Sequence, residues 1–420
     1  MKLAVIGAGW AGLACAVHAA RAGHQVALFE AARSLGGRAR RIEADGGLAL
    51  DNGQHILIGA YSATLALMRE LGVDPGQVLL RTPLQLRFAD GGGLALPHLP
   101  APLDLLVGIL RARGWNWRDK ASLLRTALAW RLAGFRCDAQ ASVAQLCAGL
   151  TPRVMQELIE PLCVSALNTP VSESSGQVFL RVLHDALFTE RGGADLLLPR
   201  VDLGRLLPDA AGDWLQGHGA QLRTGCRVQA IEGSPDKGWR VDGEAFDRVA
   251  LACAPWDAAR LVRGAGIAAQ DWLDSAEALR YEAIATVYAE GARQPLAAPM
   301  LALRSGREAP AQFVFDRGQL GSHGGLLAFV VSANGTEREQ LQAQVLAQAA
   351  RQLNEPGLRI VQTVVEKRAT FACTPGLKRP PAHIAPGLAA CGDYVEGPYP
   401  ATLEGAIRSG AGAAFQLGTA

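Results

Sequence analysis

Apolar and polar residues in the first 30 positions follow the pattern of a β-strand, a helix and a second β-strand. An apolar run at 3–6 has the length of a buried strand, and a stretch rich in alanine, leucine and valine up to about residue 22 has the length of a helix. A second apolar run at 25–29 ends at Glu30. The three elements together predict a complete βαβ unit.

Three glycines after the first predicted strand are spaced as in a dinucleotide-binding turn. Gly7 permits the tight turn, Gly9 lets a pyrophosphate approach the backbone, and Gly12 lets helix and strand pack closely. Phosphates bind at the start of such a helix, where free N–H groups and the positive end of the helix dipole meet them. Glu30 is placed to accept hydrogen bonds from a ribose diol. This context predicts a nucleotide-binding site.

The remaining pattern of strands and helices divides the chain between two domains. Short strands separated by Gly, Pro and Asp turns return between 221 and 255, and a final strand and helix follow near the C-terminus. We therefore expect an α/β fold, with a discontinuous Rossmann-like nucleotide-binding domain and a second, mixed α+β substrate domain. The nucleotide-binding parts are 1–78, 201–260 and 361–420, and the substrate parts are 79–200 and 261–360.

The segment 116–135 predicts a helix with an apolar arc bordered by cations. At about 100° per residue, Asp119, Ser122 and Thr126 lie opposite this arc. The region 111–136 contains seven Lys or Arg residues and one Asp. The arc either packs on the core with solvated basic edges, or enters a lipid surface while the cations reach the headgroups. The residues of the arc are Trp117, Ala121, Leu124, Leu128, Leu132 and Phe135.

Another helix is expected to end at Glu160, because the residue before a proline is disfavoured in helical geometry. The segment 163–170 should then be irregular and could line a cavity. Cys163 within it is expected to be a small packing residue rather than a nucleophile.

Composition narrows the class of protein. At 420 residues and 49% hydrophobic composition, the chain can build two domain cores, and its net charge of +2 gives no reason to expect a nucleic-acid partner. The eight cysteines contain no CxxC pair and the eight histidines no HExxH motif, so we expect no disulfide framework and no metal site. A reducing cytoplasm fits this usage. No apolar run approaches the roughly 18 residues of a spanning helix, so contact with the inner face of the cell membrane should be peripheral.

Lys2 and the apolar run after it imitate a secretory signal peptide. Cleavage near Ala20 would destroy the βαβ motif, whose second strand follows without a break. We therefore expect no cleaved leader.

Further glycine-containing motifs extend the predicted site. The loop 33–38 has two glycines beside an arginine, so it can pass close to a ligand and place a guanidinium on phosphates. The segment 51–55 reads Asp-Asn-Gly-Gln-His, a strand ends in Gly-Asp at 392–393, and a helix begins after Pro400. Together with the opening turn, these motifs resemble the flavin amine oxidase and phytoene desaturase superfamily.

The resemblance implies that the nucleotide is FAD. Arg38 would contact an FAD phosphate, Val228 would hold the adenine through its backbone, and Asp393 would bind the ribityl or pyrophosphate part. The last helix would begin at the pyrimidine edge of the ring, where its N-terminus stabilises the negative charge of reduced flavin. The expected cofactor-binding residues are Gly7, Gly9, Gly12, Glu30, Arg38, Val228, Asp393, Ala401 and Thr402.

The amino-acid sequences of the segments 51–61 and 163–170 resemble those of a narrower group in that superfamily, the hydroxysqualene dehydroxylases of hopanoid synthesis. This resemblance covers nearly the whole chain and implies a long isoprenoid substrate. The implied reaction is reductive dehydroxylation of hydroxysqualene to squalene by hydride transfer from reduced FAD. A general acid must reach the leaving oxygen; His55 is the candidate, and Asp51 is a weaker one.

Three alternatives stay open. A carotenoid or phytoene-type desaturase would move hydride in the opposite direction, from the polyene to FAD. A flavin amine oxidase would need an aromatic cage, for which Tyr394 and Tyr399 are candidates, and a prenyl-binding protein on the same fold would be non-catalytic. The glycines at 264–269 do not predict an NAD(P)H site, because a helix rather than a strand precedes them.

Overall fold

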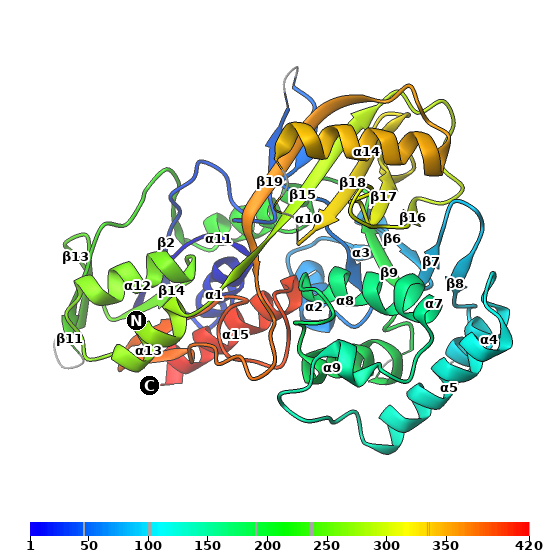
Figure 1. The fold of residues 1–420 in the computed structure, drawn as a ribbon. Helices are drawn as coiled ribbons and strands as arrows, with labels where there is room; N and C mark the ends of the chain where they lie inside the picture. Colours follow the sequence, from blue (N-terminus) through cyan, green and yellow to red (C-terminus); the bar gives the residue numbers. More distant parts are fainter. Residues whose placement is uncertain are drawn as a thin grey trace.

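The computed structural model describes residues 1–44, 47–99, 102–189, 191–234, 238–333, 335 and 337–419. Its elements form two parts, each built around one main sheet (Figure 1). Both chain termini belong to the part on the left of Figure 1.

A six-stranded sheet forms the core of the first part. Five strands pair in parallel and the sixth is antiparallel. Because the central strands are buried at nearly every position, they behave as parallel strands covered on both faces. Three distant stretches of the chain share this sheet, which confirms the expected Rossmann-like fold. The order is β10 (Gln221–Arg223), β2 (Gln25–Phe29), β1 (Lys2–Ile6), β14 (Arg248–Leu251), β21 (Leu388–Ala390) and β20 (His383–Ala385).

The first and last long helices of the chain pack against each other. Helix α1 (Trp10–Arg21) follows β1, and its buried residues are mainly alanine and other small side chains. It lies along α15 (Leu403–Thr419), and α11 (Pro208–Gly217) contacts it as well (Figure 1). The small side chains allow close approach, so both ends of the polypeptide reach the same side of the sheet.

The second part contains a five-stranded antiparallel sheet. Helix α14 (Arg338–Leu353) covers one of its faces with Leu341, Val345 and Ala349 (Figure 1). The two longest strands, β15 and β19, reach back toward the first part. The order is β16 (Met300–Ala302), β17 (Phe313–Asp316), β18 (Leu326–Ser332), β15 (Tyr281–Glu290) and β19 (Arg359–Phe371).

The boundary expected at residue 361 falls inside β19 and is wrong. The strand runs past residue 361 and includes three consecutive charged residues, 366–368. The backbone nevertheless continues to pair with β15, up to Phe371 opposite Tyr281.

Smaller elements connect these sheets. They are β3 (Arg41–Glu43), β4 (Ala49–Asp51), β5 (Leu57–Ile58), α2 (Ser62–Glu70), α3 (Pro75–Val78), β6 (Leu79–Thr82), β7 (Gln85–Arg87), β8 (Gly93–Ala95), α4 (Leu103–Arg111), α5 (Trp117–Leu132), α6 (Val143–Leu146), α7 (Pro152–Val154), the π-helical turn η1 (Met155–Ile159), α8 (Glu160–Leu167), α9 (Gly176–His184), the π-helical turn η2 (Asp185–Thr189), β9 (Leu196–Pro199), α10 (Leu203–Leu206), β11 (Ile231–Ser234), β12 (Gly238–Val241), β13 (Glu244–Phe246), α12 (Pro255–Gly264), α13 (Gln270–Glu277) and the 3₁₀ turn η3 (Arg317–Leu320).

The helix end expected at Glu160 is also wrong. The π-helical turn η1 runs directly into α8, and Pro161 lies in the first turn of α8. Proline is tolerated there because the first N–H groups of a helix have no intrahelical acceptor. Cys163 is therefore helical; it is fully buried, and burial raises the pKa of its thiol to about 11, as expected for a packing residue.

Helix α5 exposes part of its predicted apolar arc. Trp117 is 73% exposed, Leu128 57% and Leu132 80%, whereas Asp119 is buried. The Asp119 carboxylate caps the helix by accepting the N–H of Asn116, and it also accepts the Thr151 hydroxyl. Leu124 and Phe135 pack against the core, so the interpretation that the arc packs on the core holds for these residues and not for the exposed ones. Within the described part of the chain, no helix is both long and apolar enough to cross a bilayer.

Candidate active site

A large cleft runs along the carboxyl ends of the parallel strands. Gly7 follows β1, Glu30 follows β2, Ala252 follows β14 and Asp393 lies just beyond β21, and all four line this cleft of about 710 Å³. Ligands of open parallel sheets bind at this edge, because the strand ends and the helix N-termini point to it. Every cofactor residue predicted from the sequence lines the cleft except Gly12.

The glycine turn has the close contacts that its spacing predicts. Gly7 has a φ of +108°, and a Cβ atom there would lie 2.6 Å from the carbonyl oxygen of Ala252. A Cβ atom on Gly12 would lie 1.9 Å from the carbonyl oxygen of Gly7. Gly12 thus holds α1 against the end of β1, which explains why it stays outside the cleft that Gly7 and Gly9 line.

Glu30 is held at the edge of the sheet by backbone donors. One carboxylate oxygen accepts the N–H of Ala8 at 2.7 Å, and the other accepts the N–H of Ala32 at 2.8 Å. Each oxygen has further lone-pair capacity. The carboxylate is therefore rigidly placed and can still accept hydrogen bonds from a diol.

Arg38 and Asp393 form an ion pair in the cleft wall. The Arg38 guanidinium lies 2.5 Å from the Asp393 carboxylate and also donates to the carbonyl oxygen of Ala369. The Asp393 side chain is only 10% exposed, whereas that of Arg38 is 41% exposed. The residues expected at the phosphates and at the ribityl chain are thus neighbours, as one continuous ligand requires.

The far end of the cleft is formed by the start of α15. Ala401 and Thr402 line it, and Thr402 Oγ1 accepts the N–H of Gly405 at 3.1 Å. Val228 lines the cleft near the glycine turn, and its carbonyl oxygen accepts a hydrogen bond from Arg260 at 2.9 Å.

These groups fit an FAD molecule. The loops that carry Gly9 and Gly37 approach so closely that a Cβ atom on Gly37 would lie 3.1 Å from the Cα of Gly9, so backbone alone forms the cradle. A carboxylate at Glu30, a guanidinium at Arg38 and a helix start at Ala401 all line one cleft. These groups suit a ribose, a pyrophosphate and an electron-rich ring, respectively.

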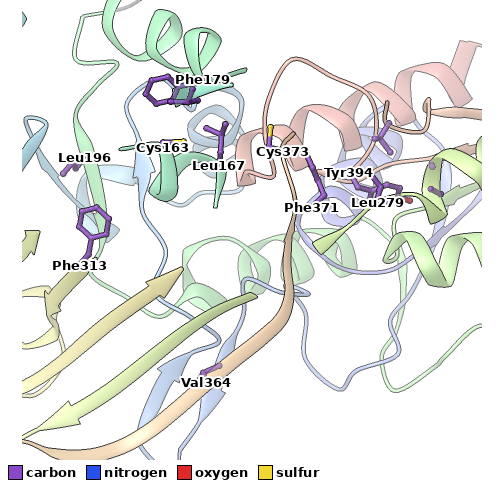
Figure 2. Packing of buried hydrophobic residues seen from close by; sticks show 14 of the residues in the cluster. Cys163, Leu167, Phe179, Leu196, Leu279, Phe313, Val364, Phe371, Cys373 and Tyr394 are labelled. Atoms are coloured by element: carbon purple, nitrogen blue, oxygen red, sulfur yellow. The ribbon is translucent and has the colours of Figure 1, made fainter. Parts of the chain in front are cut away.

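A second cavity, of about 210 Å³, has an almost wholly apolar lining. Figure 2 shows three of its lining residues, Phe179 from α9, Leu196 from β9 and Phe313 from β17. Helices α4 and α5 close another side with Ile109 and Trp130. An apolar cavity of this kind favours a hydrocarbon ligand, because burial of apolar surface supplies the binding free energy.

The cleft and the apolar cavity meet at a shared wall, which we call the junction. It begins where the segment that contains His55 leaves the cleft and where α15 begins. A ligand in the apolar cavity can therefore reach the end of the cleft that α15 forms. The residues that line both spaces are Ile56, Tyr61, Ser165, Ala166, Phe313 and Thr402.

His55 lines the cleft but is poorly suited to act as a general acid. Burial lowers the pKa of its imidazole, so the ring is neutral near pH 7. Its Nδ1 lies 2.9 Å from the carbonyl oxygen of Gly53, which can only accept a hydrogen bond. Nδ1 therefore carries the proton, and Nε2 is an acceptor.

Asp51 lies outside both cavities. It is 2% exposed and its carboxylate faces the buried Arg317 guanidinium at 3.5 Å. It accepts the N–H of Leu203 at 2.8 Å, and Arg317 also donates to Gln54 at 3.1 Å. Burial raises the pKa of Asp51 to about 6, although Arg317 lowers it. This position indicates a structural role in fixing the segment after β4, rather than the catalytic role expected from the sequence.

Sequence reasoning gave no role to Tyr61 or Arg317. Tyr61 is the last residue of the recognised segment 51–61, but only the fold shows that it lines both cavities. No sequence pattern pointed to Arg317, because its partner Asp51 is distant in the sequence. Asp51 belongs to β4, whereas Arg317 belongs to η3.

Comparison with known proteins supports the same cofactor and fold. Residues 10–417 match the family model described as flavin containing amine oxidoreductase. A hydroxysqualene dehydroxylase from Rhodopseudomonas palustris is 28% identical, and the match covers 97% of this chain and 96% of that protein. A 15-cis-phytoene desaturase from Synechococcus elongatus is 39% identical, but over only 29% of this chain and 26% of its own length. The crystal structure of an oxidoreductase from Methanosarcina mazei has a TM-score of 0.74 at 18% identity, covering 99% of this chain and 100% of that one. The protein is an FAD-dependent oxidoreductase.

We expect Asp393→Ala to lower FAD occupancy, because it removes the carboxylate that holds Arg38 beside the cleft. The bound flavin per protein should fall at least severalfold, measured from the flavin absorbance of the purified protein, and a lost charge-assisted hydrogen bond has that magnitude. The matched control is Asp271→Ala, which removes an exposed carboxylate from α13. Equal flavin content in the two variants would contradict the role of Asp393.

Asp51 should make stability depend on pH. In the folded protein its pKa is about 6, whereas in the unfolded chain it lies near 4, so the folded state binds more protons between these values. The unfolding free energy therefore falls as the pH rises from about 4 to about 6. Asp51→Asn cannot titrate, so between pH 4 and 7 the wild type should lose about 3 kcal/mol more than the variant in urea denaturation. Parallel curves for the two proteins would contradict this account.

Proposed function

The chain belongs to the flavin-containing amine oxidoreductase family, and on this basis we propose that it reduces hydroxysqualene to squalene by removing its hydroxyl group. The observation that carries the proposal is the apolar cavity that meets the FAD cleft at the junction. This arrangement suits a long hydrocarbon with one reactive position. The full-length similarity to a hydroxysqualene dehydroxylase supports the same substrate class.

The chain's own residues bind, orient and shield the substrate. The apolar side chains of the second cavity take up the isoprenoid and exclude water. When bound, FAD supplies hydride transfer. The start of α15 at Thr402 presents the positive end of a helix dipole to the cleft, which favours an electron-rich ring there.

A desaturase remains the main rival, because it would use the same apolar cavity with hydride moving the other way. Matches to phytoene desaturases cover between 29% and 62% of this chain, whereas the match to the hydroxysqualene dehydroxylase covers 97%, which favours the dehydroxylase. An amine oxidase is less well supported. Tyr394 lines the cleft whereas Tyr399 lines the apolar cavity, so these two tyrosines are not the walls of one cage. A non-catalytic prenyl-binding protein would not need the cofactor.

We also propose that the protein docks on an anionic membrane through the outer faces of α4 and α5. Of the ten exposed large hydrophobic residues among those described, seven lie between residues 99 and 132. We define the α4–α5 surface by six of them: Leu103, Leu106, Leu110, Trp117, Leu128 and Leu132. Because Ile109 and Trp130 on the same helices line the apolar cavity, this surface faces away from it.

Charge complementarity supports an anionic lipid surface as the partner of the α4–α5 surface. Seven Lys or Arg residues lie between 111 and 136, and the single Asp of that region is turned inward. Lys120 donates to the carbonyl oxygen of Leu110 and so ties the two helices together. Exposed apolar side chains with a basic border suit an anionic lipid surface, from which an isoprenoid can enter the cavity behind these helices.

The activity is tested with the reduced holoenzyme under anaerobic conditions, mixed separately with hydroxysqualene, squalene and phytoene. We expect flavin oxidation and squalene formation with hydroxysqualene, and no reaction with the other two. Product identity is read by mass spectrometry. Desaturation of phytoene by the oxidised enzyme, with no turnover of hydroxysqualene, would overturn the proposal in favour of a desaturase.

Membrane docking is tested with Arg118→Gln, Arg125→Gln and Arg131→Gln combined. Each cation near an anionic bilayer contributes about 1 kcal/mol, so partitioning onto phosphatidylglycerol vesicles should fall about a hundredfold in sedimentation. The matched control combines Arg240→Gln, Arg338→Gln and Arg351→Gln, which remove the same charge from other exposed positions. Equal loss in both triple variants would show that net charge, rather than the α4–α5 surface, determines binding.

A further inference from the structure

The junction places polar groups of the apolar cavity beside the cleft. Its members Ile56, Ala166 and Phe313 are apolar, whereas Tyr61 and Ser165 carry hydroxyl groups, as does Thr402. A hydroxylated hydrocarbon that fills the cavity must bury its one oxygen. Burial of an unpaired hydroxyl is costly, so that oxygen is expected where hydroxyl partners line the wall.

Two other polar groups along the apolar cavity, Glu404 and Asp185, are already engaged. Glu404 accepts from the N–H and the hydroxyl of Thr64 and from Arg408, and it is 1% exposed. Asp185 pairs with Arg181 at 2.8 Å and with His184 at 3.0 Å. Their carboxylates therefore serve as ion-pair partners and helix caps. They are not available to bind a neutral hydroxyl group.

Tyr61 is held at the junction by the start of α2. It is the residue before α2, and the Glu404 carboxylate fixes that helix by accepting the N–H groups of Ala63 and Thr64 at 3.0 and 2.9 Å. Thr402 lines the same two cavities as Tyr61. Burial, reinforced by Glu404, raises the pKa of Tyr61, so the phenol keeps its proton near pH 7.

We propose that Tyr61 is the residue that donates a hydrogen bond to the hydroxyl group of the substrate, with Ser165 of the same junction as a second partner. This inference rests on the proposed dehydroxylation. Ser165 Oγ donates to the carbonyl oxygen of Leu162 at 3.0 Å, so it meets the substrate as an acceptor. Tyr61 is the neutral donor that His55, an acceptor at Nε2, cannot be.

In the proposed dehydroxylation, atoms and electrons balance with Tyr61 as the source of the proton and the reduced cofactor as the source of the hydride. The C–O bond breaks and the oxygen leaves as water after taking the phenol proton of Tyr61, which solvent then replaces. The carbon gains a hydride from the reduced cofactor, which is oxidised as the carbon is reduced. Thr402 donates to the carbonyl oxygen of Pro400 over a long 3.3 Å, so its hydroxyl can turn to stabilise the phenolate that forms.

The test compares Tyr61→Phe with the wild type, both as FAD holoenzymes, using hydroxysqualene and squalene. Binding to the oxidised enzyme is followed by the change in flavin absorbance, and single turnover of the reduced enzyme by flavin oxidation. We expect affinity for hydroxysqualene to fall about tenfold and affinity for squalene to stay the same, because only the hydroxyl loses a partner. The rate of flavin oxidation should fall about a hundredfold or more, as for loss of a general acid.

Two further variants separate this role from a structural one. Ser165→Ala should weaken hydroxysqualene binding by a smaller factor, with squalene unaffected. Ser275→Ala removes a hydroxyl from α13 that lines neither cavity and should leave the preference for hydroxysqualene over squalene at the wild-type level. Wild-type turnover and preference in Tyr61→Phe would overturn the inference. No turnover of hydroxysqualene by the wild type would instead overturn the proposed function.

Discussion

Parallel pairing of β1, β14 and β21 is the constraint on which the rest of the structure depends. Parallel neighbours end at the same edge of a sheet, so residues just beyond these strands meet although long stretches of chain separate them. Gly7, Ala252 and Asp393 come together in this way, and Glu30 joins them from the end of β2. The cofactor cleft is thus a direct result of strand direction. Packing of α1 along α15 completes it, because the second helix then begins at the far end of the same cleft.

The second part of the chain depends on this frame for its orientation. Strands β15 and β19 reach toward the cleft, and the Asp51–Arg317 pair joins the segment after β4 to the turn after β17. Burial disfavours the charge on Asp51, so this pair serves geometry more than stability. The geometry matters because the chain from Asn52 to Ile56 runs from this anchor to the junction. A shift there would change how the apolar cavity meets the cleft.

The sequence predicted the parts of the site that depend on local rules and missed those that depend on packing. The glycine turn, Glu30 and the strand ending near Asp393 have strong local signals, and the structure places them in one cleft. Helix α8 continues through Pro161 because a π-helical turn precedes it, and no simple sequence pattern predicts such a turn. The orientation of α5 could not be predicted either, because an apolar arc indicates that one face of a helix is apolar but not which surface covers that face. The Asp119 capping network, which buries a charged residue, determined the outcome.

The environment of the junction also explains why a phenol suits it better than an imidazolium. An imidazolium beside an apolar cavity would tend to lose its proton, because burial next to a hydrocarbon disfavours the charged form. The same effect lowers the pKa of His55 and raises the pKa of Asp51, which favours the neutral form of each. A phenol is neutral before it reacts, so it can lie next to a hydrocarbon without an ion partner. It becomes a proton donor only as the leaving oxygen gains negative charge, and this couples proton transfer to cleavage of the C–O bond.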